Sequence, residues 1–378
     1  MTSILKSILL ATFVITLPSV KALADVTSQQ VWDGLRTAMV ASGFKLRASE
    51  TRNGTRLTIG DLQINKRFQD PAGDASGTIS LSVSSLQFLD KGNGKVNIVF
   101  PEKIPVILRS NSPNDGAFEM QLNLTQRNLV ITASGKPEEL RHDYAAETVG
   151  LNLGNFVLDG TEVPGTDVLA ELDIYDITGT SIRALRTDRN YTQNLSIGRM
   201  SYQGSMSIPS AAETRYNFSG QTTGLEFTGT TALPVILNWS DPLAVLTAGA
   251  SFDADWRYDR AEGDMSSVEG GEKFQQSSEI TAGSGRLALD KQRLSYKTKS
   301  AQSNLFLVMD ALPFPISLSL AKAAANVLLP LTANPTAQPF NLGLSLSDFV
   351  MSDMMWALFD YEEILPRDPI SLGLEVSG

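Results

Sequence analysis

The residue types that carry most enzyme chemistry are scarce in this chain. It has no cysteine and one histidine, His142, so thiolate catalysis and thiolate metal sites are excluded. A Ser-His-Asp triad would have to use His142, and no G-x-S-x-G elbow is present to expose a serine. Because His142 lies in the polar run 138–144, we expect it to be a solvated loop residue. We assign no catalytic residue from the sequence.

With no cysteine and one histidine, a metal site in this chain would have to use oxygen ligands, which suit Ca²⁺ or Mg²⁺. One stretch opens as D-x-D but then fails as a calcium loop, because Arg257 stands at the third ligand position and Tyr258 replaces the loop glycine. We expect a charged, wet hairpin there, with a weak Ca²⁺ site as the alternative, and we assign no metal ligand. The acids of this stretch are Asp253, Asp255, Asp259, Glu262 and Asp264.

The sequence has no clear motif for glycoside cleavage or for dinucleotide binding. Paired carboxylates can cleave glycosides, but nothing in the sequence singles out a pair. The Gly283-Ser284-Gly285 motif opens a strand rather than a helix, so it is not a dinucleotide-binding fingerprint. We assign no cofactor.

The first 24 residues have the pattern of a secretory signal peptide. Lys6 charges a short n-region, an uncharged apolar run covers 7–20, and Ala22-Leu23-Ala24 forms an A-x-A cleavage site. The run is shorter than the roughly 20 residues of a membrane-spanning helix, which makes a retained anchor the weaker alternative. We expect cleavage after Ala24 and export to a Gram-negative periplasm.

The charge balance of the exported chain limits its partners. Without residues 1–24 it carries 29 basic and 41 acidic residues, a net charge of −12. Nucleic acids and anionic membrane surfaces are bound by basic patches, so neither is an expected partner. No later segment reaches the about 18 consecutive apolar residues of a transmembrane helix, and the lack of cysteine excludes disulfides and a lipoprotein anchor.

Most of the chain has the period-two alternation of half-buried strands. Asn53-Gly54 is a strong hairpin signal, and strands follow one another at short spacing without interleaved helices. We therefore predict a mainly β fold in one domain over 25–378. It is an elongated, twisted antiparallel meander, half-barrel-like or sandwich-like, with an N-terminal helix and few short helices. Clear alternation covers 78–83, 95–100, 118–124, 286–289, 304–309, 316–320 and 340–346.

The predicted N-terminal helix begins at a capping box formed by Thr27 and Gln30. Apolar residues at four-residue spacing follow, and Gly43 is a suitable residue to end the helix. The stripe is expected to pack on a sheet, with binding of a partner as the alternative. It consists of Val31, Leu35 and Met39.

Other segments are predicted to be irregular or helical. Short helices are expected from Asp241-Pro242 to Gly249 and from Ser352 or Asp353 to Phe359. The polar stretch Asp259–Glu279 is expected to form a mobile hairpin tip or loop.

Two late segments, 311–316 and 323–331, are unusually hydrophobic for this chain, and methionines cluster nearby at Met351, Met354 and Met355. Such surfaces adapt to apolar partners, with packing in the core as the alternative.

The C-terminal third carries a family signature. The motif Met355-Trp356, Phe359-Asp360 and Leu365-Pro366-Arg367-Asp368-Pro369 leads into the strand 370–378, and the mature start 24–27 with Val31-Trp32 fits the same pattern. The chain resembles the alphaproteobacterial exported proteins of the domain-of-unknown-function family numbered 2125. It departs from that family at Tyr361, where a proline is usual. The resemblance implies an exported, β-rich envelope protein, and longer family members imply that this chain is truncated after its last strand.

Within the LPRDP segment, the expected role is a rigid turn from helix to strand in which Arg367 and Asp368 bond locally.

We predict a non-catalytic periplasmic protein that binds or shields a lipid or another apolar envelope component. A structural or assembly factor contacting other envelope proteins is the alternative, and a carboxylate-dependent hydrolase is the third hypothesis.

Overall fold

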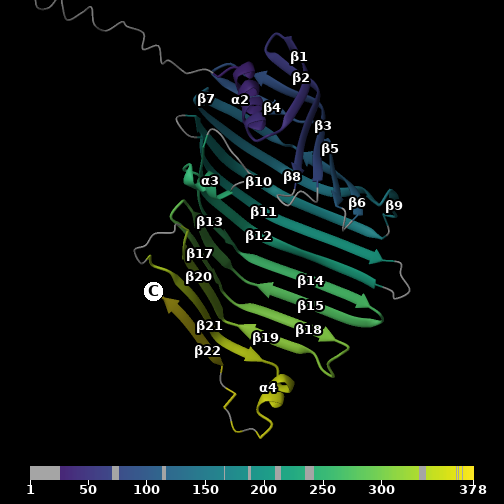
Figure 1. The fold of residues 1–378 in the computed structure, drawn as a ribbon, viewed down its shortest axis with the longest axis vertical. Coiled ribbons are helices and arrows are strands. Elements are labelled where there is room, and N and C mark those ends of the chain that lie inside the picture. The colour runs from purple at the N-terminus through teal and green to yellow at the C-terminus, as the bar shows by residue number, and fades with distance from the viewer. Residues whose placement is uncertain are drawn as a thin grey trace, which may run out of the picture.

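The structure of the chain is a computed structural model. It describes residues 26–378 except 70–75, 113–115, 166, 186–188, 209–213, 235–241, 332–337, 363, 365 and 368. The predicted signal peptide and its cleavage site therefore lie outside the described residues. The described part is dominated by one twisted antiparallel sheet, as predicted from the alternation, and Figure 1 shows the sheet running the length of an elongated molecule.

The N-terminal helix α2 (Ser28–Ala41) forms as predicted. The Thr27 side chain accepts a hydrogen bond from the backbone N–H of Gln30, and the Gln30 side chain accepts one from the backbone N–H of Thr27, which completes the capping box. Gly43 follows the C-cap residue Ser42 with φ +87°, a conformation that glycine adopts without strain. The helix is therefore bounded by its own sequence at both ends.

The strands pair in chain order as a meander. The first half of the sheet is continuous from β1 through β2, β3, β5, β6, β8, β10 and β11, with β4 and β7 bridging β3 to β8 and β9 beside the end of β8. These strands are β1 (Lys45–Asn53), β2 (Arg56–Gln69), β3 (Ser76–Asp90), β4 (Lys95–Val99), β5 (Lys103–Ser112), β6 (Gly116–Arg127), β7 (Val130–Lys136), β8 (Glu139–Leu158), β9 (Thr161–Val163), β10 (Val168–Leu185) and β11 (Arg189–Ile208).

The second half continues from β12, along which the sheet divides into two runs of shorter strands that meet again at β21. One run is β13, β16, β17 and β20, and the other is β14, β15, β18 and β19. The bounds are β12 (Thr214–Leu233), β13 (Ser251–Tyr258), β14 (Arg260–Glu269), β15 (Glu272–Ile280), β16 (Gly283–Leu289), β17 (Arg293–Ser300), β18 (Ser303–Met309), β19 (Ile316–Leu320), β20 (Lys322–Pro330), β21 (Asn341–Met351) and β22 (Ile370–Ser377).

A single line of backbone breaks crosses the sheet, and we call it the crease. β13 and β14 continue one another across Asp259, which lies opposite Gly224 of β12, and Gly224 in turn lies opposite Gly198 of β11 and then Asp176 of β10. The left-handed conformation recurs along this line, with φ values of +49°, +55°, +55°, +62° and +53° at Asp61, Asn128, Asp176, Gly224 and Asp348. The crease divides the sheet into a β13 arm and a β14 arm, each named after one of its strands (Figure 1).

The crease also shifts the side-chain alternation by one residue. In β2, Leu57 and Ile59 before Asp61 and Leu62 and Ile64 after it all belong to one buried core. Uninterrupted alternation would send the second pair to the opposite face. Since the same kind of break lies in line in the later strands, the apolar residues of both arms fall on one face, which we call the apolar face. The opposite side is the charged face.

Helix α2 covers one end of the apolar face. It contacts β1, β2 and β3, and Trp32 is 1% exposed, stacks at a tilt on Phe88 with ring centroids 5.9 Å apart, and donates a hydrogen bond from Nε1 to Glu50. Ser28 bonds Asp90 through both its backbone N–H and its hydroxyl. The packed core of the molecule therefore lies under this helix.

The stretch Asp259–Glu279, predicted as a hairpin tip or loop, is a hairpin of two paired strands within the sheet, so the loop alternative is wrong. This stretch forms β14 and most of β15, joined by a tight turn at Gly270-Gly271. Its polar side chains alternate with Ala261, Met265 and Phe274, so one face of the pair is polar and the other apolar. Full pairing with β12 and β18 on either side satisfies the backbone and holds the segment in the sheet. The short helices α3 (Pro242–Thr247) and α4 (Asp353–Phe359) form where predicted.

We predict that Gly224→Ala destabilises the fold by about 1–2 kcal/mol or more. The left-handed conformation alone costs an L-residue about that much, and a Cβ at Gly224 would also lie 2.1 Å from Asp259 Oδ2. The midpoint of urea unfolding measures the effect.

Gly373→Ala is the control for this prediction, because a Cβ at Gly373 meets no atom within 4 Å. An equal midpoint for both variants would contradict the structural role of the crease.

Candidate functional site

The candidate site is the part of the apolar face that α2 does not reach. Across the β14 arm, register places Met206, Phe218 and Met265 beside one another or one strand apart, with Tyr202 next to Gly220 on the same face. These four side chains are between 38% and 47% exposed. The rings of Tyr202 and Phe218 lie 6.4 Å apart, and a Cβ at Gly204 would meet the Phe218 ring, so a glycine floor lets the aromatic rings lie flat on the sheet.

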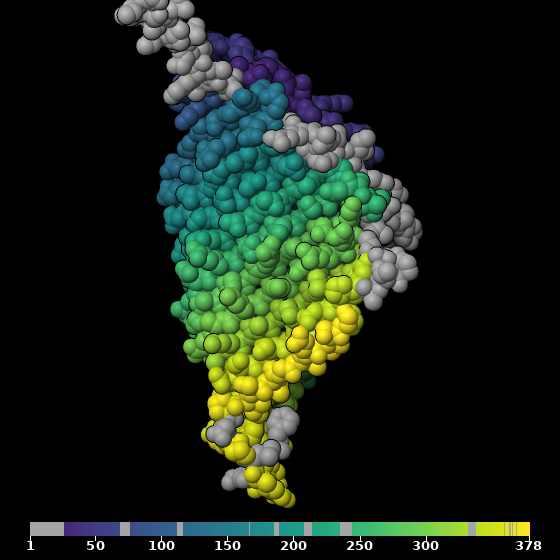
Figure 2. Space-filling model, turned by 90° about the vertical axis from the view of Figure 1, so that its left-hand side faces the viewer, coloured from purple at the N-terminus to yellow at the C-terminus, as the bar shows by residue number. Residues whose placement is uncertain are grey.

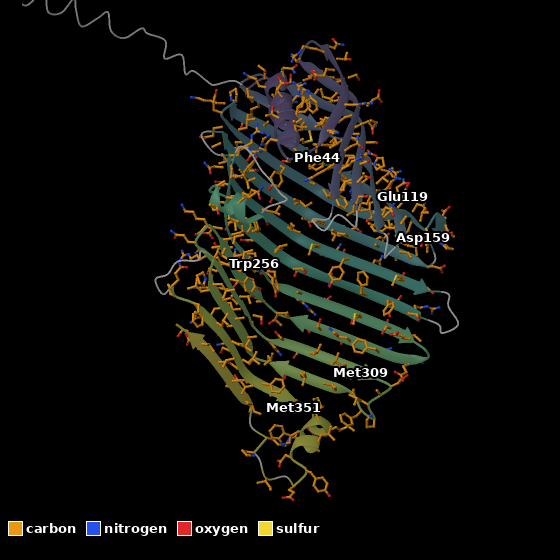
Figure 3. All side chains as sticks on the ribbon, in the orientation of Figure 1. Phe44, Glu119, Asp159, Trp256, Met309 and Met351 are labelled. Carbon is orange, nitrogen blue, oxygen red and sulfur yellow. The ribbon has the colours of Figure 1, made fainter. Side chains whose placement is uncertain are left out.

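The same face continues over the β13 arm towards the end of the sheet. Trp256 stacks on Tyr296 with centroids 6.1 Å apart and lies over Gly285. Beyond them, Leu342 and Leu344 of β21 are 42% and 47% exposed. Figure 3 shows Trp256 and Met309 on the two arms of the sheet. Other exposed side chains of this row are Leu329, Leu372, Leu374 and Val376.

Burial changes sharply along the chain. The buried hydrophobic core cluster is drawn from residues 26–140, whereas after residue 200 the buried hydrophobic residues of the described part are Val245, Ala250 and Ala254. A sheet normally buries its apolar face against a second layer. The second half of this sheet therefore presents an apolar face to solvent. Its exposed apolar side chains form a continuous row across many strands, whereas an ordinary surface has only scattered ones.

The charged face carries a shallow hollow of about 1050 Å³ on the β13 arm. Two rows of side chains flank it, one containing Glu226, Arg257 and Lys299 and the other containing Arg286 and Lys297. The hollow exists because the small residues Ser284, Ala324, Gly343, Ser345 and Gly373 occupy the intervening positions.

Ion pairs hold the charges of this face. Arg257 lies 2.6 Å from Glu226 and Arg286 lies 2.7 Å from Asp253, and the Arg257 guanidinium keeps the pKa of the Glu226 carboxyl below its usual value by hydrogen bonding. These groups are about half exposed, so each pair contributes little to stability. The arrangement is that of a solvated outer face.

The acidic stretch 253–264 lies on β13 and β14 and the residue between them. Asp253 and Asp255 belong to β13, and Glu262 and Asp264 belong to β14 on the other side of the crease. Among the described residues no group of three or more His, Cys, Asp or Glu could hold a metal ion.

The loop assignment of His142 is wrong. The run 139–144 is part of β8, and alternation directs Leu140, His142 and Tyr144 to the face that α2 covers, while Arg141 and Asp143 pair with each other on the opposite face. His142 is largely buried, and burial together with the nearby Arg183 charge lowers its pKa, against a smaller opposing effect of Asp143.

Arg183 connects the sheet to the helix. It is 7% exposed and donates a hydrogen bond from Nη1 to the carbonyl of Gly34 over 2.9 Å. A Cβ at Gly34 would lie 2.4 Å from the Arg183 guanidinium, so glycine allows α2 to approach the strand. Burial lowers the pKa of Arg183.

The LPRDP segment follows α4, and Arg367 forms an ion pair with Asp353 at the start of that helix. Asp368, the predicted local partner, lies outside the described residues. Of the two hydrophobic segments, 311–316 connects β18 to β19 and enters a strand only at Ile316, whereas 323–331 forms most of β20. Met351 ends β21 and lies in a small hollow with Trp356 and Phe349.

The row Tyr202, Phe218 and Met265 was not singled out from the sequence. Its signal in the sequence was the alternation of successive long strands, and among the described residues no second set of strands covers them. None of the described helices is long and apolar enough to cross a bilayer.

Comparison with known proteins found no matching family model, curated protein or solved structure. The resemblance seen in the C-terminal motif therefore stays a prediction.

We predict that the free energy of unfolding falls as pH drops from 7.5 to 5.5. The folded state lowers the pKa of His142, so below the unfolded value of about 6.5 the unfolded chain binds more protons and is favoured. His142 is the only histidine, and no other side chain ordinarily titrates in this window. Urea unfolding at both pH values measures the change.

His142→Gln provides the control, because it removes the titrating group. The variant should lose most of the difference between the two pH values, and a wild-type protein with equal stability at both would contradict the burial of a neutral imidazole.

Proposed function

We propose that this protein is a non-catalytic lipid-binding protein whose apolar face takes acyl chains or a similar apolar ligand. The observation that carries the proposal is the exposed row of Tyr202, Phe218 and Met265 and its continuation over Leu342 and Leu344. Apolar surface gains about 25 cal/mol per Å² on leaving water. A flexible hydrocarbon chain fits such a face because it can follow a twisted sheet without needing polar partners.

Location in the periplasm is part of the proposal. An exported protein in a periplasm lies between two membranes and meets apolar envelope components that are poorly soluble in water. The open apolar face would shield such a component, while the charged face with its solvated ion pairs keeps the complex soluble.

A non-catalytic role is proposed because the carboxyl groups with perturbed pKa values are perturbed in the wrong direction for a general acid. The pKa values of Glu50, Asp143, Glu226 and Asp353 are all lowered, in each case first by a hydrogen bond from a neighbouring side chain. A hydrolase that uses two carboxylates needs one of them to hold its proton near neutral pH. These four groups serve as ion-pair and hydrogen-bond acceptors.

The alternative role, an assembly factor that contacts other envelope proteins, is favoured by a different feature. Among the described strands β22 pairs with β21 alone, and its side chains Leu372, Leu374 and Val376 are exposed. An edge strand with a single charged residue is a template for a strand of another protein. Crosslinking in cells that returned one reproducible protein partner at β22, with no lipid on the purified protein, would favour this role.

The first test of lipid binding is native mass spectrometry, with lipid extraction, on protein purified from a periplasm. We expect a bound mass in the range of one or more lipids at near-stoichiometric amount. A clean mass of the protein alone, from cells in which it is exported, would contradict the proposal.

A matched pair of variants tests which face binds. Phe218 on the apolar face is 47% exposed and Phe306 on the charged face is 43% exposed, so the two substitutions remove the same ring at similar exposure. Phe218→Ser should weaken binding of a fluorescent fatty acid about tenfold, the effect of losing roughly 1.5 kcal/mol of apolar contact.

Phe306→Ser should leave the affinity within about twofold of the wild type, because its ring lies on the charged face. Equal loss in the two variants would show that the probe binds without regard to the apolar face.

A further inference from the structure

The narrow end of the molecule carries an apolar tip formed by α4 and the residues after it. Figure 1 places α4 beyond β19 and β21, at the end of the molecule opposite α2, and Figure 2 shows the molecule tapering towards this end. β21 leads directly into the tip, because Met351 is its last residue and Ser352 is the N-cap of α4. The tip is thus a continuation of the sheet and not a separate unit.

Four large apolar side chains project from the tip into solvent. Met354 is 53% exposed, Leu358 is 66% exposed, Tyr361 is 89% exposed and Ile364 is 73% exposed. Tyr361 and Ile364 are more exposed than any other large hydrophobic residue of the described chain. Their exposure is costly in water, and its concentration within eleven positions marks an interaction surface.

Polar contacts fix the backbone of the tip. Asp360 is 7% exposed and accepts a hydrogen bond from the backbone N–H of Ile364 over 2.8 Å, while its own N–H donates to the carbonyl of Trp356. Arg367 pairs with Asp353 and joins the end of the segment to the start of the helix. The side chain of Trp356 lies inward, in a hollow of about 150 Å³ with Phe349 and Met351.

The size of the tip favours a bilayer over a protein as its partner. At roughly 200 Å² for each large side chain, the exposed fractions amount to about 600 Å², below the roughly 800 Å² that each partner contributes to a specific protein interface. A bilayer does not require a minimum contact area, because separate apolar side chains can insert singly between lipid headgroups.

The charge around the tip selects the kind of bilayer. Glu362 follows Tyr361 directly, Asp353 and Asp360 lie within the same segment, and Arg367 is the basic residue of the segment and is already paired with Asp353. An acidic segment on a chain of net charge −10 is repelled by anionic lipids. The fitting surface is therefore a bilayer of zwitterionic phospholipid.

We propose that the tip docks the protein on a zwitterionic phospholipid bilayer through Met354, Leu358, Tyr361 and Ile364, from which the apolar face draws its ligand. This inference rests on the proposed lipid-binding function, since it names the source of the lipid. Register supports the connection, because Leu318 on the apolar face of β19 lies directly opposite Met351, which Figure 3 places beside α4. A chain leaving the bilayer at the tip would meet the apolar face without crossing water.

The experiment is co-sedimentation of the full chain with sucrose-loaded vesicles of phosphatidylcholine. The double variant Leu358→Ser with Ile364→Ser should lower the partition coefficient at least about tenfold, because two inserted apolar side chains are lost. The matched control is Val40→Ser in α2, which is 56% exposed at the other end of the molecule and should leave partition unchanged. Circular dichroism checks that both variants are folded.

Fluorescent fatty-acid binding, measured without vesicles, separates this inference from the proposed function. The tip variant should bind the probe like the wild type, and Phe218→Ser should bind vesicles like the wild type. Three results would each overturn the docking role. The tip variant could bind vesicles as well as the wild type, the wild type could fail to bind vesicles, or its binding could rise when a third of the lipid is anionic. Vesicle binding through the tip without any probe binding would leave docking in place and contradict the lipid-carrying function.

Discussion

The crease is the constraint on which the rest of the structure depends. A meander of long strands would ordinarily alternate without interruption, and its apolar residues would change faces wherever the pattern slipped. Here the slip occurs at the same level in strand after strand, at Asp61, Asn128, Asp176, Gly224 and Asp348. Since all strands shift together, register is kept and one face stays apolar along both arms.

The asymmetry of the two ends follows from this arrangement. At the N-terminal end α2 covers the apolar face, with Trp32 and Phe88 at the centre of a dry core and Arg183 bonded to the carbonyl of Gly34. Further along, the sheet continues as a single layer with an open apolar face. The covered end supplies hydrophobic stabilisation to the fold, and the rest of the face is open to solvent.

Three features of the molecule fit one physical role when they are considered together. The apolar face is open to solvent, the charged face keeps its ion pairs in water, and the tip at the far end exposes large apolar side chains within an acidic segment. Under the proposed function, the path of a ligand would run along the sheet from the tip towards α2, where the helix covers the face.

Much of the architecture could be predicted from local pattern. The capping box of Thr27 and Gln30, a hairpin near Asn53-Gly54, the antiparallel meander and the short helices depend on interactions between near neighbours, and all were found. The hairpin turn itself is Gly54-Thr55, one residue later than predicted. The assignments of His142 and of 259–279 to loops were wrong, because their polarity was taken for exposure when alternate residues face the sheet interior. Composition and spacing alone determined the fold class, the absence of cysteine chemistry and the charge. Only the tertiary structure decided which face is left uncovered, since the crease, the seat of α2 and the position of the tip depend on pairings between residues far apart in the chain, which no local pattern encodes.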